Sequence, residues 1–313
     1  MSQLLRNIDA RSRLAGTNNL EILLFTLGED NEGVRREVYG INVFKVREVM
    51  RAPAITRAPE MAPSVAGMVS LRGALVPVVD LARYLGVTPA ERARFMIVTE
   101  YNGHTQGFLV EAVETILRLD WSRMRVPPDM LSGNRGGLVT AVTAVADGRL
   151  VMMLDVEKIL AETVDTDDDS QYRGLDAGVP PNRTVFFADD SSVARKQITR
   201  TLDTMKVNHM SAMNGKQAWQ ELAKIADNAE ATGTRVKDHV QLVLTDVEMP
   251  EMDGYMLTRC IKADARFNGI PVLMHSSLSG VSNQQLGFSV GVDEYVPKFQ
   301  PGKLASTLTR LLA

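Results

Sequence analysis

The stretch LVLTDVEMPEMDG, residues 242–254, decides the fold of the second half of the chain. Its first residues, Leu-Val-Leu, form a short apolar run that is typical of a strand buried on both faces of a parallel sheet. The run ends at Asp246, and the pair Asp253-Gly254 favours a turn. Because the reactive groups of open α/β sheets lie beyond the carboxyl ends of the strands, Asp246 is a candidate reactive carboxylate. A polar residue that only ends a strand would give the same pattern, so matching residues elsewhere decide the interpretation.

Three other apolar runs end in polar residues of complementary kinds. TVFFADDSS ends at Asp189-Asp190, IPVLMHSS ends at Ser276-Ser277, and DEYVPKF ends at Lys298. If the four strands are parallel, one edge of the sheet carries three carboxylates, a hydroxyl group and an ammonium group. Hard oxygen ligands of this kind suit Mg²⁺, so the pattern predicts a magnesium site beside a nucleophilic aspartate.

Residues 184–313 resemble the response-regulator receiver domain, the phospho-acceptor half of two-component signalling, because the same constellation occurs in the same order. The resemblance implies a doubly wound, flavodoxin-like α/β fold. It also implies one role for each site residue: Asp246 as the phospho-acceptor, Asp189, Asp190, Asp246 and the backbone carbonyl of Glu248 as Mg²⁺ ligands, Ser276 as the hydroxyl switch, Tyr295 as the aromatic switch, and Lys298 as the phosphate-binding lysine.

Two residues near the end of the third of these strands depart from the receiver pattern. Ser276 stands where threonine is commoner, and His275 precedes it where an apolar residue is usual. We expect His275 to face solvent at the end of its strand. Singly, a serine here is more often a turn hydroxyl and Tyr295 a half-buried strand aromatic, so the switch roles rest on the whole constellation.

The composition describes an ordinary globular protein of about two domains. The chain has 313 residues, 45% hydrophobic and 23% charged, and a net charge of −3. This balance lacks the basic excess of a nucleic-acid surface, so we expect no nucleic-acid partner. Cys260 is the one cysteine, which excludes an internal disulfide and fits a reducing cytosol. No run approaches the ~20 apolar residues of a membrane span, so we expect a cytoplasmic protein without direct membrane insertion.

Residues 20–164 have the texture of β structure. Short runs rich in Val, Ile, Leu and Phe alternate with Gly, Asn and Asp at fairly even spacing, which favours a sandwich or small barrel with short helices at its edges. Residues 154–160 predict a closing helix. We find no nucleophile–base pair in this half, no glycine-rich phosphate loop and no His/Cys cluster with metal spacing. The first half therefore points to binding rather than catalysis.

Three stretches of this half are distinctive: YGINVFKVREV (residues 39–49), GMVSLRGALVPVVDL (residues 67–81) and LVMMLDVEKIL (residues 150–160). On these stretches the half resembles the CheW-type coupling domain of bacterial chemotaxis. The resemblance implies a pair of five-stranded β-barrels with a groove between them, a surface that couples chemoreceptors to the histidine kinase CheA. The matching partner-binding positions are Val46, Glu48, Gly67 and Arg72.

The residues themselves leave other interpretations of two of these positions open. We favour partner binding for Arg72, and the alternatives are a solvated turn cation or one half of an internal salt bridge. Ordinary core packing explains Val46 as well as contact with a partner does. Three further segments carry no chemistry of their own. Residues 1–19 predict an arm or short helix, residues 165–183 an acidic solvated linker, and residues 227–239 an insertion or an extended helix.

The order of the two domains is that of the CheV family of chemotaxis coupling proteins. The resemblance implies an adaptor that joins methyl-accepting chemoreceptors to CheA and is regulated by phosphorylation of Asp246. One alternative is a phosphate sink, in which the receiver drains the kinase without altering coupling. A second is an aspartyl phosphatase, which would carry another acidic residue two positions after the nucleophile in a D-x-D-x-T/V pattern. The sequence Asp246-Val247-Glu248-Met249-Pro250 breaks that pattern, so we expect no enzyme.

Overall fold

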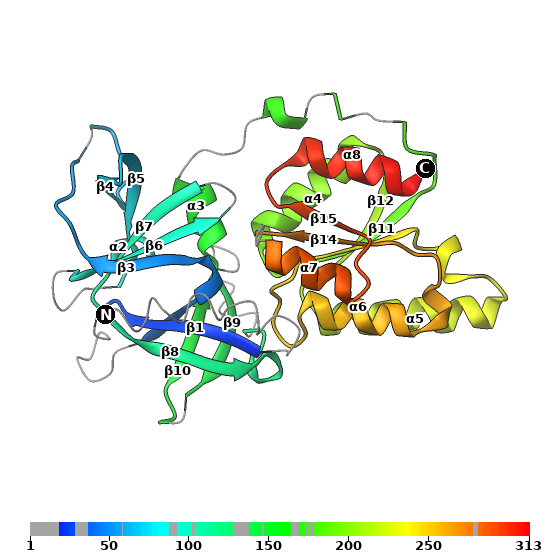
Figure 1. Ribbon diagram of the computed structural model, residues 1–313, viewed down its shortest axis with the longest axis horizontal. Coiled ribbons are helices and arrows are strands. Elements are labelled where there is room, and N and C mark those ends of the chain that lie inside the picture. The colour runs from blue at the N-terminus through cyan, green and yellow to red at the C-terminus, as the bar shows by residue number, and fades with distance from the viewer. Residues whose placement is uncertain are drawn as a thin grey trace. The chain divides into compact units, whose positions relative to one another are not determined.

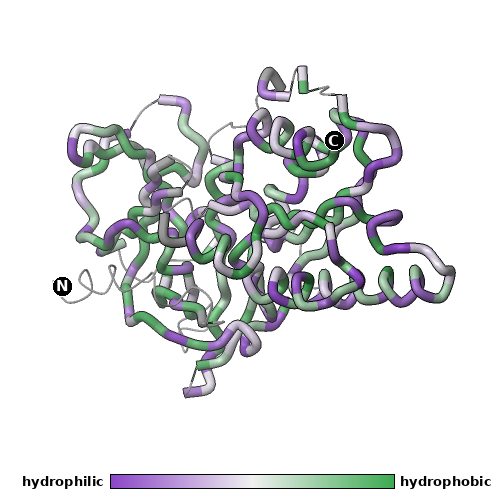
Figure 2. Tube along the Cα trace, turned by 45° about the vertical axis from the view of Figure 1, so that its right-hand side comes forward, coloured by the Kyte–Doolittle hydropathy of each residue, from purple (hydrophilic) through white to green (hydrophobic). Residues whose placement is uncertain are grey.

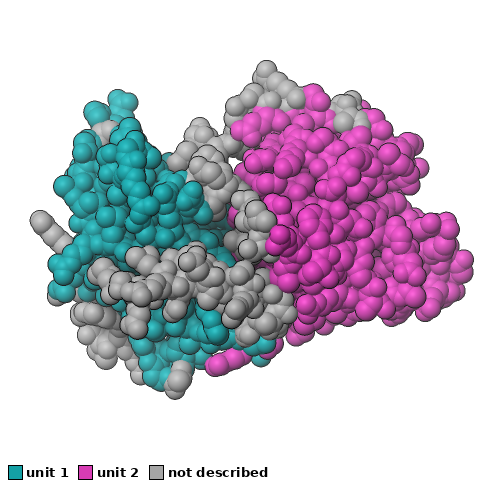
Figure 3. Space-filling model, in the orientation of Figure 1, with its two compact units in different colours: residues 1–11, 20–120, 124–165 teal, residues 12–19, 121–123, 166–313 magenta. Residues whose placement is uncertain are grey.

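The structure is a computed structural model, in which the chain forms two compact units that we describe separately (Figures 1 and 3). The first unit holds most of residues 20–165, and the second holds most of residues 166–313. The residues described are 19–28, 37–57, 59–87, 93–101, 104–127, 138–145, 147–163, 169–172, 174–175, 178–277 and 281–313.

The first unit contains two five-stranded sheets. The first sheet has the order β8-β1-β2-β10-β9 and the second the order β3-β6-β7-β5-β4. Their strands are β1 (Asn19–Thr26), β2 (Val38–Asn42), β3 (Val46–Arg51), β4 (Val65–Leu71), β5 (Ala74–Asp80), β6 (Phe95–Tyr101), β7 (His104–Val110), β8 (Ala112–Asp120), β9 (Val139–Ala144) and β10 (Leu150–Leu154). Two five-stranded β-sheets confirm the mostly-β fold expected of a CheW-like domain.

One hydrophobic core joins the two sheets. Phe25 and Ile41 come from the first sheet, Ile97 and Phe108 come from the second, and all four are fully buried in the same cluster. The helix α3 (Val156–Thr163) adds its apolar side to this core. The second sheet has a separate cluster on its other face, and the short helices η2 (Val43–Lys45) and α2 (Leu81–Leu85) complete the unit. The short helix η3 (Trp121–Arg123) directly follows β8. The strands of the second sheet that contribute to both hydrophobic clusters, such as β5 and β6, are therefore covered on both faces.

The second unit is a parallel sheet with helices on both faces. Its strand order is β12-β11-β13-β14-β15, and every neighbouring pair is parallel. The strands are β11 (Thr184–Ala188), β12 (Asn208–Ala212), β13 (Leu242–Thr245), β14 (Val272–Ser276) and β15 (Glu294–Pro297). The helices are α4 (Ser192–Thr204), α5 (Gly215–Thr232), α6 (Gly254–Ala263), α7 (Val281–Ser289) and α8 (Pro301–Leu312), with short turns η5 (Asp169–Tyr172), η6 (Val236–Asp238) and η7 (Ala265–Phe267). The doubly wound fold is confirmed.

Amphipathic helices cover the two faces of this sheet. Ile198 of α4 and Leu308 of α8 pack on one face, whereas Leu222 of α5 and Leu257 of α6 pack on the other. The trace of these helices alternates between hydrophilic and hydrophobic residues in Figure 2, as expected when one side of a helix is buried. The central strand β13 is buried on both sides, as the apolar run at residues 242–244 predicts.

Two segments without predicted chemistry have defined structure. Helix α5 continues to Thr232, so the polar segment from residue 227 is in large part an extended helix. Tyr172 and Leu175, inside the predicted linker, are each 9% exposed and belong to the core formed with α4 and α8. The Arg200 guanidinium lies 4.1 Å from the centre of the Tyr172 ring, a cation–π contact. The acidic residues 165–168 lie outside the described residues.

The expectation that His275 faces solvent is wrong. His275 is 3% exposed, because β14 lies inside the sheet, between β13 and β15, and pairs with Val296 at this position. Side chains alternate along a strand, so His275 lies on the same face as Leu273, which packs with α4 and α8. The residue is thus part of the packed interior directly before Ser276.

Close packing at the start of α6 gives a direct test of the fold. A Cβ atom at Gly254 would lie 2.0 Å from the backbone oxygen of Asp246, so Gly254→Ala must shift backbone. We expect a loss of about 1–3 kcal/mol in the free energy of unfolding, measured on the second unit's transition by calorimetry of the full chain. Gly302→Ala, in α8 with open space around its Cβ position, is the matched control and should be neutral or stabilising. Equal melting temperatures for Gly254→Ala and wild type would contradict this packing.

Candidate functional sites

The predicted site residues of the receiver unit meet at one edge of the parallel sheet. Asp189 follows β11, Asp246 follows β13, Ser276 ends β14 and Lys298 follows β15. These four strands are consecutive neighbours in the sheet, so their carboxyl ends lie side by side. The topology alone therefore brings together residues that are up to 109 positions apart, as the sequence pattern predicts.

The centre of this edge is a buried cluster of three charges. The Lys298 ammonium nitrogen lies 2.9 Å from Oδ2 of Asp189 and 2.8 Å from Oδ2 of Asp246. The side chains of Asp189 and Lys298 are 0% and 1% exposed, and that of Asp246 is 5% exposed. At this burial the carboxylates would repel each other strongly without a cation between them. Lys298 supplies that cation.

Local hydrogen bonds hold the Asp189-Asp190 turn in place. Oδ1 of Asp189 accepts a hydrogen bond from the backbone N–H of Ser191 at 2.9 Å, and Ser191 caps α4. Arg195, in the first turns of α4, donates to the backbone oxygen of Asp189 at 2.8 Å. The acidic pair is therefore fixed by the helix that follows it. Sequence reasoning missed Arg195, although its place five residues after Asp190 puts it within reach of the turn.

The loop after Asp246 is fixed by contacts to its backbone. Oδ1 of Asp246 accepts a hydrogen bond from the N–H of Val247 at 2.6 Å, and the N–H of Gly254 donates to the Val247 oxygen at 2.9 Å. The side chain of Glu248, two residues after the candidate acceptor, is buried, and the residue is 8% exposed. The ligand role of its backbone carbonyl stays a prediction.

The two predicted switch residues contact each other. Tyr295 is 7% exposed, its side chain is hydrogen-bonded to Ser276, and burial raises the pKa of the phenol above its ordinary value. A second phenol, that of Tyr255 at the start of α6, has its pKa raised by burial and by the charges of Tyr295, Asp253, Glu248 and Asp246. Both phenols are therefore neutral at physiological pH. Sequence reasoning missed Tyr255, which reads as an ordinary apolar helix position.

The acidic residues of this edge fit a divalent cation. Asp189, Asp190 and Asp246 can each offer one carboxylate oxygen, and these oxygens lie within 4.8 Å of one another. Three carboxylates exceed the single positive charge of Lys298, and hard oxygen donors suit Mg²⁺. The donor set thus agrees with the predicted magnesium site. The finer assignment of ligands stays a prediction.

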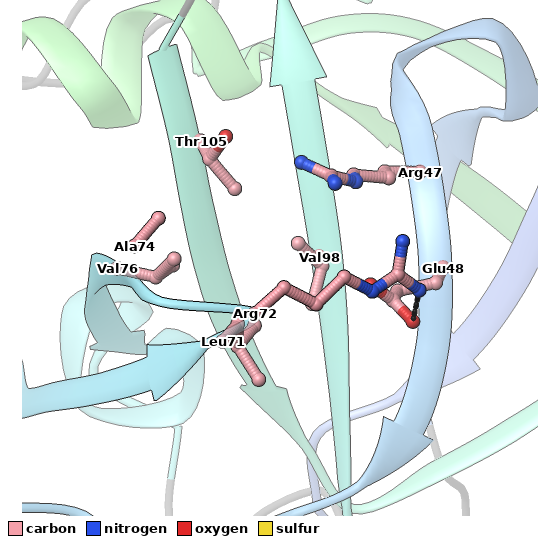
Figure 4. A pocket seen from close by; sticks show the side chains of 8 residues that line it. All are labelled: Arg47, Glu48, Leu71, Arg72, Ala74, Val76, Val98 and Thr105. Carbon is pink, nitrogen blue, oxygen red and sulfur yellow. Dashed lines mark hydrogen bonds and ion pairs between the residues drawn. The ribbon is translucent and has the colours of Figure 1, made fainter.

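A second candidate site is a groove on the second sheet of the first unit (Figure 4). It has a volume of about 80 Å³ and an apolar floor that includes Val76 and Val98, which are 1% and 0% exposed. Glu48 and Arg72 form an ion pair across it at 3.0 Å, with Arg72 reaching over from the β4–β5 turn. The lining residues are Arg47, Glu48, Leu71, Arg72, Ala74, Val76, Val98 and Thr105.

The backbone at this turn is unusual in a way that bears on Arg72. Arg72 and Gly73 connect β4 to β5, and both have positive φ, 52° and 85°. This matches the two-residue hairpin turn that normally takes Asn or Gly at its first position. Positive φ strains the backbone of a residue other than glycine, and such strain at Arg72 supports a functional role for this side chain. The ion pair with Glu48 is the internal salt bridge that was one of the alternatives for Arg72. The Arg72 side chain is still 69% exposed, so a partner could also contact it.

The other two predicted contact residues lie elsewhere. Val46 is 6% exposed in the core shared by the two sheets, so packing accounts for it. Gly67 has φ of 146°, and a Cβ atom there would lie 2.3 Å from the backbone oxygen of Thr56, which bonds to the N–H of Met68. Gly67 therefore permits a close backbone approach. Only Glu48 and Arg72 of the four predicted positions line the groove.

Comparisons with known proteins find relatives of both halves of the chain. Residues 21–164 match the family model of the CheW-like domain, and residues 185–309 match that of the response regulator receiver domain. The chain is 28% identical over 301 residues to the chemotaxis protein CheV3 of Helicobacter pylori, covering 94% of this chain and 95% of that protein. The chain is a CheV-like protein, a CheW-like domain followed by a receiver domain. It is thus a chemotaxis protein with a CheW-like adaptor domain and a receiver domain, and its CheV relatives are not classical enzymes.

Single-domain relatives match each half of this CheV-like chain. The chemotaxis protein CheW of Klebsiella aerogenes is 30% identical over 154 residues, covering 48% of this chain and 87% of that protein. The chemotaxis protein CheY1 of Helicobacter pylori is 31% identical over 130 residues, covering 41% of this chain and 95% of that protein. None of the helices among the described residues combines the length and apolarity needed to cross a bilayer.

The charge cluster predicts a stability that depends on both Lys298 and Mg²⁺. Lys298→Met leaves Asp189 and Asp246 buried without their cation, which should cost about 3–5 kcal/mol in the absence of divalent ions. Mg²⁺ should restore part of that loss, so the rise in melting temperature on adding Mg²⁺ should be larger in Lys298→Met than in wild type. Lys262→Met, which removes an exposed pair with Asp293, is the control and should respond to Mg²⁺ like wild type. Identical Mg²⁺ responses in all three proteins would exclude this account.

Proposed function

We propose that the protein couples methyl-accepting chemoreceptors to the histidine kinase CheA and that phosphorylation of Asp246 regulates this coupling. The observation that carries the proposal is the presence, in one chain, of a CheW-like domain with a lined groove and a receiver domain with a buried Asp–Lys–Asp cluster. A receiver domain acts on its pathway by changing how the protein binds a partner. Among the described residues, the groove of the first unit is the candidate surface for that binding. The protein would act in the cytoplasm, associated with receptor arrays through protein contacts.

The chemistry at the receiver is transfer of one phosphoryl group. An Asp246 carboxylate oxygen attacks the phosphorus of a phosphohistidine, the N–P bond breaks, and an acyl phosphate forms while the histidine nitrogen keeps the electron pair. Such a reaction needs positioning and charge neutralisation more than acid–base catalysis. Asp246 is well placed for it, because the hydrogen bond from the N–H of Val247 fixes one oxygen and Lys298 contacts the other. Water then hydrolyses the acyl phosphate slowly.

The remaining residues divide between charge neutralisation and response. Asp189, Asp190, Asp246 and the carbonyl of Glu248 would hold Mg²⁺, which supplies positive charge for the phosphoryl oxygens when it is bound. Lys298 would exchange one carboxylate oxygen for a phosphoryl oxygen, since an ammonium group on a flexible stem is a mobile point charge. Ser276 would leave its hydrogen bond with Tyr295 to contact the phosphoryl group, and Tyr295 would then repack.

The groove suits a protein partner better than a small molecule. Its volume of about 80 Å³ admits one apolar side chain, whereas small-molecule sites measure about 300–1,000 Å³. Its rim carries the cations Arg47 and Arg72 beside Glu48, so a partner with an apolar side chain next to an acidic group would replace Glu48 at Arg72. An arginine at the rim of an apolar pocket is a frequent anchor of protein interfaces.

The site of phosphorylation is tested by a matched pair of asparagine variants. Label should pass from phosphorylated CheA to the wild-type protein only with Mg²⁺, and Asp246→Asn should reduce labelling to background because the attacking oxygen is lost. Asp264→Asn, which alters a capping aspartate before η7, should label like wild type. Undiminished labelling of Asp246→Asn would refute the assignment.

The coupling surface is tested by reversing one charge. Arg72→Glu places a carboxylate beside Glu48 at the groove rim, so binding to receptor–kinase complexes in a sedimentation assay should weaken about tenfold or more. Arg118→Glu makes the same change in an exposed ion pair with Glu21 on the first sheet and should bind like wild type. Equal weakening by both variants would point to a general effect of charge and not to the groove.

Regulation and the phosphate sink predict different binding curves. If phosphorylation alters coupling, a phosphodonor should change the affinity for receptor–kinase complexes several-fold, as coupling energies of about 1–3 kcal/mol allow. Tyr295→Ala should blunt that change and leave Asp246 labelling intact, because the phenol lies at Ser276 and not in the Asp–Lys–Asp cluster. Coincident curves for stoichiometrically labelled wild-type protein would favour the sink.

A further inference from the structure

Helix α3 lies against the strands of the groove from the opposite face. Thr105 of β7 lines the groove, and the next residue, Gln106, points the other way and is 1% exposed. The apolar residues Ile159 and Leu160 of α3 pack in the core on that second face. Strands β3, β6 and β7 are consecutive in the sheet, so the groove and α3 are on the two sides of the same three strands.

Two polar contacts join α3 to β7 and to Lys45, the residue directly before β3. Oε1 of Glu157 lies 3.0 Å from the ammonium nitrogen of Lys45, which directly precedes β3 and therefore Arg47 and Glu48 of the groove. The side-chain amide of Gln106 donates a hydrogen bond to Oγ1 of Thr163 at 3.1 Å. A third contact joins Tyr84 of α2 to Glu162. Helix α3 thus contacts β7 on one side of β6 and, on the other side, the residue that directly precedes β3.

The Glu157–Lys45 pair makes the position of α3 matter to β3. Glu157 is 1% exposed and Lys45 is 17% exposed, so moving the helix must either separate a largely buried pair or move Lys45 with it. Separation is costly, because an unpaired buried carboxylate is strongly unfavourable. A shift of α3 that keeps this pair would move Lys45, which directly precedes β3 and the groove residues Arg47 and Glu48.

Helix α3 is also the element of the first unit that leads into the second. Thr163 is its last residue, and the next residues found in the receiver core, Tyr172 and Leu175, follow nine and twelve positions later. A force on the connecting segment acts first on the C-terminal turn of α3, where Glu162 and Thr163 make two of the three polar contacts.

We propose that α3 relays the state of the receiver to the groove, with Glu157 and Thr163 as positioning residues for the strands that line it. The proposal rests on the proposed regulation by phosphorylation and specifies its route. It assigns the effect to a shift of α3 behind the groove and not to direct covering of the groove by the receiver.

The test compares affinities of the full-length protein for receptor–kinase complexes with and without acetyl phosphate. Wild type should show a several-fold change on phosphorylation, whereas Glu157→Gln, which removes the charge and keeps the shape, should show less than a twofold change. Lys45→Arg preserves the pair and should retain the full change. Glu21→Gln makes the same substitution in the ion pair with Arg118 on the first sheet and should behave like wild type.

The outcomes separate the relay from the regulation on which it rests. If wild type shows no change on phosphorylation, regulation fails and the relay with it. If wild type and Glu157→Gln change equally, only the relay is overturned. Amide hydrogen exchange of the wild-type protein gives an answer that needs no variant. Acetyl phosphate should alter protection in α3 and in β3 together, and unaltered exchange in both elements alongside an altered affinity would also overturn the relay.

Discussion

The receiver unit depends on the need to bury two carboxylates beside each other. Asp189 and Asp246 end neighbouring strands, and neither has access to enough water to be stable as an isolated charge. Lys298, from the strand end two places away in the sheet from Asp246, neutralises them by contact with both. This arrangement needs parallel strands in this order, so the charge cluster and the topology require each other. It also leaves net negative charge, which fits the binding of a cation at the same place.

The first unit solves a related problem with different parts. Its two sheets share one apolar core. Hydrophobic interactions are non-directional, so this core does not by itself fix how a helix lies on a sheet. The buried pair of Glu157 and Lys45 adds direction, because an unpaired partner would be costly. Buried ion pairs contribute little net stability compared with apolar packing, and their clearer effect is to exclude alternative arrangements. In both units, then, packing supplies the stability, and a lysine paired with a buried carboxylate selects the geometry.

Much of this could be predicted from the sequence, for identifiable reasons. Each site residue of the receiver ends its own apolar run, so the strand ends of a parallel sheet could be found without knowing their order. His275 was mispredicted because its exposure depends on β14 being an inner strand, a property of the whole sheet. Tyr172 and Leu175 were missed because two apolar residues among acidic and glycine residues have no periodicity.

The groove was predicted less completely than the receiver site. Its lining combines residues from β3 to β7 that are distant in sequence, and a register shift between Val46 and Glu48 interrupts the alternation that sequence reasoning relies on. That irregularity separates buried Val46 from Arg47 and Glu48 at the rim, although the resemblance treated Val46 and Glu48 alike. Gly67 was assigned to the partner surface for a similar reason. The sequence alone does not distinguish a glycine that permits close backbone approach from one that contacts a partner.

The division of the chain into two sites sets a physical limit on how they can act on each other. The proposed switch would rearrange Ser276 and Tyr295 within one domain, and the free energy that it could transmit is only that by which phosphorylation favours one arrangement over the other. Thr163 ends α3 and Tyr172 belongs to the core of the second unit, so only eight residues of sequence separate the two. Under the proposed relay, a difference of about 1–3 kcal/mol between the two arrangements of the receiver would be enough to shift the affinity of the groove several-fold.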